Sequence, residues 1–308
     1  MSPLRTLLHL IRLGRPHFLV GGVLLHVLGV TIALYHGAAL DLWALLWGQV
    51  AVSATQMMTH YSNDYFDVAA DVANETPTSW SGGSRVLAEG LLAPRWALAL
   101  ALLFAMLALA ATALLVLGGS TGPLAAPLLL LALALAWGYS APPFTLHSRG
   151  VGELTVAFVV PVLTVAVGYY LQAGQLRLLP LLAALPLALF QFVMLLAIEF
   201  PDALGDAAVG KRTLVVRLGP EAAAKLLVTL LALVYVALPL LVVAGLPPLV
   251  ALLLALFAAP LVAWVTVRLR AGAATDPRWW NWLGFVGVAL VVGSATVELV
   301  AFLSLMAR

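Results

Sequence analysis

The sequence predicts an all-α integral membrane protein with about nine transmembrane helices. Of its 308 residues, 64% are hydrophobic and only 9% are charged, whereas a soluble domain of this size carries roughly a quarter charged residues. The apolar residues are gathered in stretches of roughly 20, the length that spans the hydrocarbon core of a lipid bilayer. Cysteine is absent and the net charge is +2. We therefore expect no disulfides, no Cys-ligated metal and no nucleic-acid partner.

Nine segments qualify as membrane spans by their length and apolar content. The tightest break between them is Gly245-Leu246-Pro247-Pro248, where two prolines prevent one helix from continuing. We expect no cleavable signal peptide, because the first span lacks a small-residue cleavage site. One polytopic domain over residues 1–308 is expected. The expected spans are residues 17–36, 43–66, 96–117, 122–141, 151–172, 178–200, 222–245, 247–267 and 281–304.

Lysine and arginine are distributed unevenly between the two ends of these spans. If the N-terminus is cytoplasmic, only Arg177 and Arg308 of the 15 basic residues fall outside, as the positive-inside rule requires. We therefore expect a cytoplasmic N-terminus and an external C-terminus, in the inner membrane of a prokaryotic cell. The two long polar loops, 67–95 and 201–221, are then both cytoplasmic, and the functional site is expected there.

Two clusters of acidic and amide side chains follow the second and the sixth span. Within each cluster several side chains are three or four residues apart, so a continuing helix would place them on one face. Carboxylates at helix C-termini repel one another and the helix dipole, and a bound divalent cation would offset this cost. Oxygen-only ligands favour Mg²⁺ or Ca²⁺ over zinc, and Mg²⁺ usually shares its shell with a substrate phosphate. The clusters are Asn63, Asp64, Asp67 and Asp71, and Glu199, Asp202 and Asp206.

The two clusters recur at a constant interval. Asp67 and Asp202 are 135 residues apart, and so are Asp71 and Asp206. Four spans lie in that interval, so we expect two four-helix units plus a ninth helix around a central cavity. The clusters would face each other there, with two or more Mg²⁺ ions holding one diphosphate. The alternative is a merely solvated loop face, which is how we interpret other acidic residues such as Glu75.

Basic side chains follow both clusters. Arg85 ends the Gly-rich turn that begins at Ser81, and Lys211 and Arg212 follow the second cluster. Gly-rich turns let backbone N–H groups approach phosphate oxygens, and basic side chains supply charge. With two Mg²⁺ ions, these residues come close to balancing five aspartates and the roughly three negative charges of a diphosphate ester. Taken alone, they are better explained as positive-inside anchors.

Together, these motifs resemble the UbiA superfamily of intramembrane prenyltransferases, over the whole chain and including the helix count. The segments 81–87 and 199–202 are most similar to the 1,4-dihydroxy-2-naphthoate branch. Ile198 departs from the pattern, which has asparagine there, and so removes one candidate metal or water contact. The matching motifs are Asn63-Asp64-x-x-Asp67-x-x-x-Asp71, Tyr139-Ser140-Ala141-Pro142-Pro143 with Arg149-Gly150, and Asp202-x-x-x-Asp206-x-x-x-Gly210-Lys211-Arg212-Thr213.

The resemblance implies Mg²⁺-dependent transfer of an isoprenyl group from an isoprenyl diphosphate to an aromatic acceptor, as in menaquinone-type quinone biosynthesis. Asp67, Asp202 and Tyr139 would be catalytic. The expected metal ligands are Asn63, Asp64, Asp67, Asp71, Asp202 and Asp206, and the expected substrate-binding cations are Arg85, Arg149, Lys211 and Arg212.

Several roles have more than one explanation. The ring of Tyr139 could stabilise an allylic cation or belong to an interfacial aromatic belt. Arg149 or Arg15, both expected apart from the acidic clusters, could bind an acceptor carboxylate or be ordinary anchors. We expect His60 to be a satisfied buried histidine.

Other functions remain open at this point. The acceptor could instead be 4-hydroxybenzoate, homogentisate or a lipid alcohol. A secondary transporter also uses internal repeats and intramembrane acids, but its acids are expected at mid-span on broken helices rather than at helix ends. A phosphatidyl-type transferase is expected to have fewer spans and a single Asp run.

Overall fold

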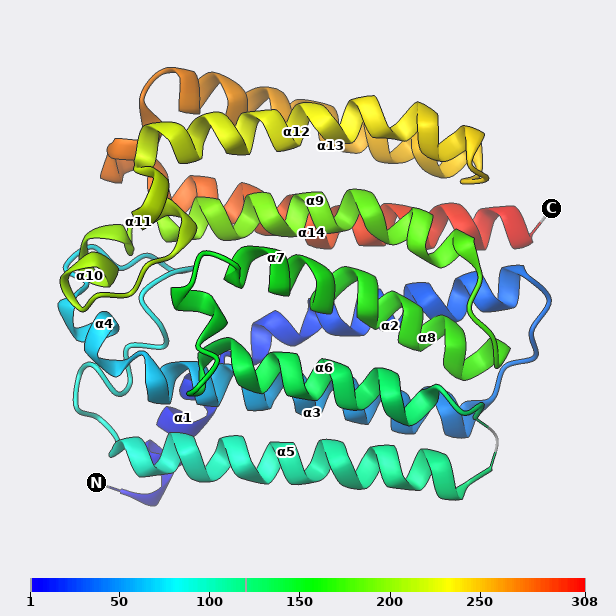
Figure 1. The fold of residues 1–308 in the computed structure, drawn as a ribbon, viewed down its shortest axis with the longest axis horizontal. Helices are drawn as coiled ribbons and strands as arrows, with labels where there is room; N and C mark the ends of the chain where they lie inside the picture. The colour runs from blue at the N-terminus through cyan, green and yellow to red at the C-terminus, as the bar shows by residue number, and fades with distance from the viewer. Residues whose placement is uncertain (1, 120, 308) are drawn as a thin grey trace.

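The computed structural model describes residues 2–119 and 121–307, and these residues form helices and connecting turns without a β-strand. Within them, nine long helical segments run along one common axis (Figure 1). The short helices α4, α10 and α11 are gathered at one end of this bundle. We call it the Asp end, because both acidic clusters lie there. The predicted all-α membrane protein is confirmed.

The long segments have bounds close to the predicted spans. They are α2 (Leu19–Tyr35), α3 (Leu42–Phe66), α5 (Pro94–Leu117), α6 (Ala125–Ser140), α7 (Gly152–Ala157) continued by a π-helical turn (Phe158–Leu163) into α8 (Thr164–Ala173), α9 (Leu178–Glu199), α12 (Pro220–Val243), α13 (Pro248–Arg270) and α14 (Pro277–Met306). The shorter helices are α1 (Pro3–Gly14), α4 (Val68–Ala73), α10 (Ala203–Ala208) and α11 (Leu214–Leu218), with 3₁₀ turns at Pro16–Phe18, Leu146–Ser148 and Ala273–Thr275.

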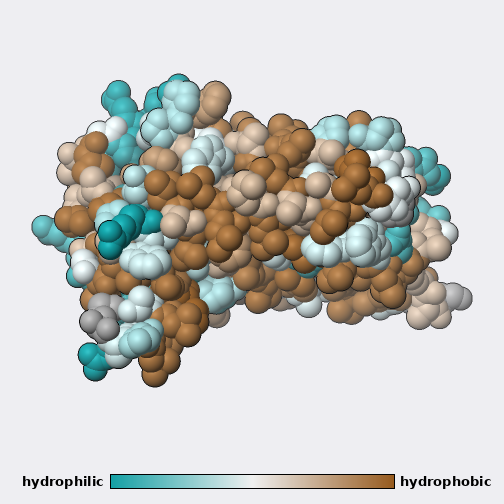
Figure 2. Space-filling model, turned by 90° about the horizontal axis from the view of Figure 1, so that it is seen from below, coloured by the Kyte–Doolittle hydropathy of each residue, from teal (hydrophilic) through white to brown (hydrophobic). Residues whose placement is uncertain are grey.

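Seven helical runs in the described residues are long and apolar enough to cross a membrane. The other two long helices are α6, which has only 16 residues and spans about 24 Å, and α3, which carries polar side chains such as Gln49 and Gln56. On the face shown in Figure 2, apolar atoms cover the middle of the molecule and polar atoms gather at its two ends. This distribution matches a bilayer with water on both sides.

The bundle has the expected two units and one additional helix. The first unit is α2, α3, α5 and α6, and the second is α7–α8, α9, α12 and α13. Helix α14 packs on α2, α9 and α13 and so joins the two units. Both α3 and α9 run toward the Asp end, while α14 ends at the opposite end (Figure 1).

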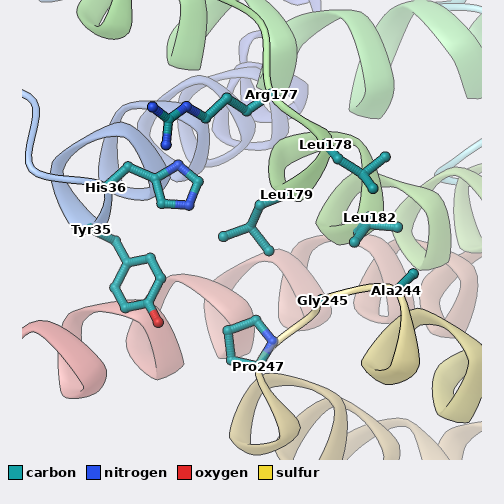
Figure 3. Close-up of a pocket in the computed structure, with 9 residues that line it drawn as sticks. All are labelled: Tyr35, His36, Arg177, Leu178, Leu179, Leu182, Ala244, Gly245 and Pro247. Carbon is teal, nitrogen blue, oxygen red and sulfur yellow. The ribbon is translucent and has the colours of Figure 1, made fainter.

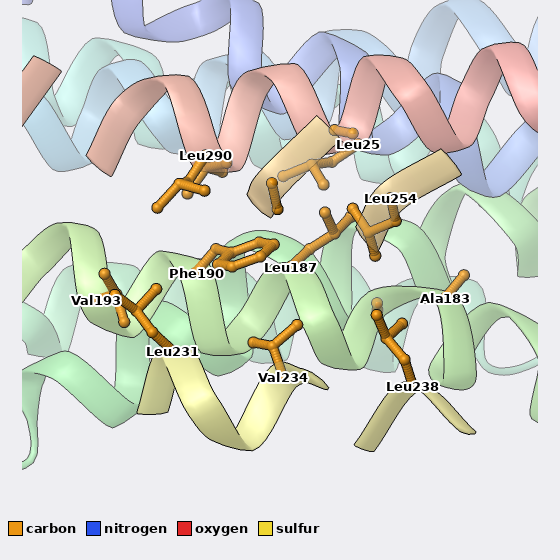
Figure 4. Packing of buried hydrophobic residues seen from close by; sticks show 14 of the residues in the cluster. Leu25, Ala183, Leu187, Phe190, Val193, Leu231, Val234, Leu238, Leu254 and Leu290 are labelled. Carbon is orange, nitrogen blue, oxygen red and sulfur yellow. The ribbon is translucent and has the colours of Figure 1, made fainter. Parts of the chain in front are cut away.

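The apolar core is centred on α9. Its side chains Leu187 and Phe190 are fully buried among residues of α2, α12, α13 and α14, such as Leu25, Leu231 and Leu290 (Figure 4). Helix α9 is therefore held by apolar contacts on several sides along its length, up to the Asp end.

Each acidic cluster is divided between two helices, so the prediction of one continuing helix face is wrong. Helix α3 ends at Phe66, Asp67 has non-helical backbone angles (φ −96°, ψ 5°), and α4 begins at Val68. Helix α9 ends at Glu199, and Pro201, which lacks an amide hydrogen, lies in the turn before α10. These breaks turn α4 and α10 across the end of the bundle.

Candidate active site

A polar pocket lies at the Asp end, between the ends of α3 and α9, and acidic residues of both clusters line it. Helices α4 and α10 pack closely here, since a Cβ added to Gly205 would lie 2.9 Å from the amide nitrogen of Asn74. The close packing brings the two clusters to one pocket. The two halves of the chain thus contribute to a single site.

Asp67 is buried and fully engaged by neighbouring groups. One carboxylate oxygen lies 2.7 Å from His147 Nε2, and the other accepts from Lys211 Nζ at 2.9 Å and from Asn63 Nδ2 at 2.7 Å. Lys211 Nζ also lies 3.4 Å from Asp206. Burial alone would raise the pKa of Asp67, but the Lys211 ammonium and the His147 contact hold it well below its usual value. Asp67 is therefore a charged link between the two units.

Asp64 is also paired with a cation. Its carboxylate accepts from Arg15 Nη2 at 2.8 Å and from the backbone amide of Ser84 at 3.1 Å. The expectation that Arg15 lies apart from the acidic clusters is therefore wrong. Arg15 has left-handed backbone angles (φ 47°, ψ 55°) at the end of α1, and this reversal carries its side chain to the end of α3.

Asp202 and Asp71 face the Gly-rich turn. Asp202 accepts from Asn74 Nδ2 at 2.6 Å and from the amide of Gly82 at 3.3 Å. A Cβ added to Gly83 would overlap the carboxylate of Asp71, so only glycine leaves room for that carboxylate. Gly82 and Gly83 both have positive φ angles, which glycine adopts without strain.

Negative charge is only partly compensated on this side of the pocket. Burial, reinforced by the nearby charges of Asp64 and Asp67, raises the pKa of Asp71 to about 8. Burial and the charge of Asp206 raise the pKa of Asp202 to about 7. Near neutral pH these carboxyls are therefore partly protonated, and a bound cation would displace their protons.

The pocket has the chemistry that a Mg²⁺ ion requires. Its acidic donors are all oxygens, and Glu199 Oε2, on a pocket residue, is buried without a hydrogen-bond partner. Among the residues that the structure describes, no three His, Cys, Asp or Glu side chains already stand together as a metal site. A bound cation would therefore have to draw Asp71, Asp202 and Asp206 together. The donor types fit Mg²⁺.

The third sequence motif also reaches the pocket. Tyr139 lines it, and its ring lies edge-on to His147 with centroids 5.5 Å apart. Ser140 Oγ accepts from Asn63 Nδ2 at 3.2 Å. An aromatic ring thus borders the space in which the acidic clusters meet.

Of the four expected substrate-binding cations, only Lys211 lines the pocket. Arg85 donates to the backbone carbonyl of Asp71, which fixes the Gly-rich turn against α4. Arg149 is exposed and donates to the carbonyl of Pro143 at 2.6 Å, and Arg212 is exposed. The structure therefore does not bring Arg149 and Arg212 to the pocket.

The sequence does not predict that Asn74, His147 and Arg15 belong to this site. Asn74 follows Asp71 by one helical turn, and this spacing could have indicated that it belongs to the first cluster. His147 and Arg15 have no regular spacing to either cluster. Only tertiary packing brings them to Asp67 and Asp64.

A second pocket, of about 610 Å³, lies at the opposite end of the bundle (Figure 3). It is bordered by Tyr35 and His36 at the end of α2, by Arg177 before α9, and by the turn between α12 and α13. Its lining contains no acidic residue, so it lacks the ligands for a divalent cation.

Comparison with known proteins agrees with this arrangement. The sequence model of the UbiA prenyltransferase family matches residues 23–286. The chain is 32% identical over 230 residues to the bacteriochlorophyll synthase 33 kDa chain of Cereibacter sphaeroides, which covers 74% of this chain and 71% of that protein.

Solved structures share the fold. The apo structure of a UbiA homologue from Aeropyrum pernix K1 superposes with a TM-score of 0.68 at 20% identity, covering 91% of this chain and 97% of that one. A UbiA homologue from Archaeoglobus fulgidus bound to DMAPP and Mg²⁺ gives a TM-score of 0.62 at 17% identity, covering 94% and 98%.

The chain belongs to the UbiA prenyltransferase family. It is thus an integral membrane enzyme that transfers a prenyl group, which confirms the class predicted from the paired Asp motifs.

Proposed function

We propose that this protein transfers an isoprenyl group from an isoprenyl diphosphate to an aromatic acceptor, with Mg²⁺ as cofactor. The observation that carries the proposal is the pocket at the Asp end, where carboxylates from two four-helix units meet beside Lys211 and Arg15. The homologue from Archaeoglobus fulgidus, bound to DMAPP and Mg²⁺, supports this choice of substrate and ion.

Asp71, Asp202 and Asp206 are the residues best suited to hold Mg²⁺, because they line the pocket and burial raises their pKa values, even though Lys211 lies near Asp206. Bound Mg²⁺ would neutralise the diphosphate as its ester bond breaks. Asn63 and Asp67 line the other side of the pocket, and the buried Asp64 binds Arg15, which lines it; these residues would act as further ligands or hold the cations next to them.

The chain's own cations and rings have separate roles. Lys211 and Arg15 both line the pocket and can stabilise negative charge on the departing diphosphate. The π face of Tyr139 can stabilise the allylic cation, and the surrounding apolar helices exclude water that would capture it.

For the acceptor, we propose an electron-rich bicyclic aromatic acid of the dihydroxynaphthoate type, which would make the product a quinone precursor. The support is the similarity of segments 81–87 and 199–202 to that branch. The structure adds that residues 81–83 and 199 line the pocket, so these segments can influence the choice of acceptor.

A second candidate acceptor is a chlorophyll-type macrocycle. The observation that favours it is the 32% identity to a bacteriochlorophyll synthase chain over 74% of this sequence. A macrocycle would have to reach the pocket from the membrane or from its open side, and it would still use the same diphosphate site.

The test is an acceptor screen with purified protein in lipid vesicles, one long isoprenyl diphosphate and Mg²⁺. Dihydroxynaphthoate, 4-hydroxybenzoate and a chlorophyllide are supplied separately, and products are identified by mass spectrometry alongside released diphosphate. We expect a prenylated naphthoate and no diphosphate release when EDTA replaces Mg²⁺. A product with one of the other acceptors only would overturn the acceptor, whereas no metal-dependent release with any acceptor would overturn the function.

A further inference from the structure

Helix α1 is separate from the first membrane span. It ends at Gly14, and the chain reverses through Arg15, which has φ 47°, and Pro16, which begins a 3₁₀ turn before α2. In Figure 1, α1 lies obliquely to the long helices, at the Asp end and beyond α3 and α5. It is therefore neither a span nor part of the bundle core.

One face of α1 is fixed to α3. Leu13 is fully buried and Leu10 is partly buried in a cluster that includes Tyr61. The Tyr61 hydroxyl donates to the carbonyl of Leu10 at 3.0 Å, and His60 Nδ1 lies 2.8 Å from the carbonyl of Gly14. These contacts fix the rotation of α1 about its own axis and so determine which residues face outward.

The outward face is apolar. Leu4, Leu7, Leu8 and Ile11 recur at the three- and four-residue spacing of one helix face, and these residues are 66%, 53%, 56% and 49% exposed. In Figure 2 the arm that carries α1 projects at the lower left, with apolar atoms on the side toward the apolar middle of the molecule and polar atoms on the other side. The exposed face is thus level with the edge of the membrane-spanning surface.

Basic residues border this apolar face. Arg5 and Arg12 are seven residues apart, and both are exposed. Residues 1–40 contain no aspartate or glutamate. Arg12 lies 3.6 Å from Glu89, but both side chains are more than 40% exposed, and such surface pairs contribute little. The helix therefore presents positive charge next to hydrophobic surface.

We propose that α1 is an interfacial helix that binds the anionic lipid surface of the leaflet at the Asp end. Its leucines would enter the headgroup–acyl boundary, as the apolar faces of interfacial helices do. Its arginines would extend toward lipid phosphates while their alkyl parts stay on the apolar surface. This goes beyond the prenyl transfer and does not depend on the identity of its substrates.

The proposed lipid-binding helix is adjacent in sequence to a residue of the candidate active site. The residue that follows α1 is Arg15, whose guanidinium donates to Asp64 and lines the pocket. A membrane-bound α1 would thus hold Arg15 in place.

The absence of cysteine makes the test direct, because single cysteines can be spin-labelled without background. The label is placed at Leu8→Cys on α1, at Leu103→Cys on the exposed side of α5, and at Glu75→Cys in an exposed loop. Labelled protein is reconstituted in phosphatidylcholine vesicles with and without phosphatidylglycerol. Accessibility to oxygen, which partitions into lipid, is compared with accessibility to a water-soluble nickel chelate.

We expect the label at Leu8→Cys to resemble Leu103→Cys rather than Glu75→Cys, and to move deeper when phosphatidylglycerol is present. Replacing Arg5 with Gln should lower the equilibrium constant for membrane binding of α1 about fivefold in anionic vesicles, whereas Arg270→Gln, at the same end of the bundle, should not. A water-exposed label at Leu8→Cys, no effect of phosphatidylglycerol, or spin–spin coupling between two copies through α1 would each overturn the proposal.

Discussion

Asp67 and Asp71 are one helical turn apart and stand in opposite electrostatic surroundings. Asp67 contacts Lys211, His147 and Asn63, so its charged form is stabilised. The Asp71 carboxylate has no hydrogen-bond donor among the described residues, and its pKa is raised to about 8. An ionised aspartate thus stabilises the protein at position 67 and destabilises it at position 71.

Asp71→Asn and Asp67→Asn should therefore change stability in opposite directions while both abolish turnover. Because the folded-state pKa of Asp71 is raised, the stability it contributes is present below its unfolded value near 4 and is lost as the pH rises through about 8. Asp71→Asn should raise the free energy of unfolding without Mg²⁺ at alkaline pH, by up to about 5 kcal/mol for a pKa shift of this size, and change it little at pH 4. Asp67→Asn should lower it by about 3 kcal/mol, since Lys211 loses a buried partner.

Thermal unfolding in detergent across this pH range, with turnover measured in parallel, checks both variants. Glu75→Gln, in an exposed loop, is the control for loss of a negative charge alone. A destabilised Asp71→Asn protein at alkaline pH would show that Asp71 has a stabilising partner, and full turnover would remove it from the metal site.

Helices α2 and α8 pack against each other at very short distance through a glycine on each helix. A Cβ on Gly29 would overlap the carbonyl oxygen of Val165, and one on Gly168 would overlap that of His26. These are backbone atoms, which cannot move aside as a flexible side chain can. Since α2 belongs to the first unit and α8 to the second, this contact sets the distance between the units.

Gly29→Ala should separate α2 from α8 and lower the free energy of unfolding by about 2 kcal/mol, the usual cost of overpacking. The matched control is Gly21→Ala in the same helix, where an added Cβ meets no atom within 4 Å. That variant should be neutral or more stable, because alanine favours helices over glycine. Equal unfolding temperatures for the two variants would contradict the close α2–α8 contact.

The sequence predicts the long helices well and the short helices poorly. Apolar length alone defines α5, α9, α12 and α13, because lipid requires such stretches. The break at Asp67 has no proline or glycine to indicate it, and beyond the break α4 packs on α10, which is distant in the sequence. Helix α1 was not expected either, since twelve residues are too few for a span.

For the whole molecule, the distribution of basic residues predicts the orientation in the membrane. The structure has α1 and the acidic clusters at one end and the last turn of α14 at the other (Figure 1). With the Asp end rich in arginine, we predict a cytoplasmic N-terminus and a cytoplasmic active site. Reporter fusions at the two termini should fall on opposite sides of the membrane, and a fusion in the exposed turn at Gln175 should fall outside. Termini on the same side would contradict an odd number of spans.

The sequence could place both acidic clusters at one site because the interval of 135 residues encloses an even number of spans. It could not predict the pairing of Arg15 with Asp64 or of His147 with Asp67. Those contacts depend on the tertiary positions of short turns that lie outside the repeat. Local sequence spacing does not predict these positions. Arg149 and Arg212 show the converse, since a position near a motif did not bring them into the pocket.

The repeat also has an evolutionary consequence. A unit of four helices enters and leaves on the same side of a bilayer, so a duplicated gene encodes two units in parallel orientation without any inversion of topology. A single ancestral unit would have carried only half of the carboxylates, and it could have formed a complete site only by pairing with an identical subunit about an axis normal to the membrane. After fusion of the two genes, the two halves could differ in sequence. Lys211, which follows the second cluster and binds Asp67 of the first, has no counterpart at the equivalent place in the first half, where Thr76 stands.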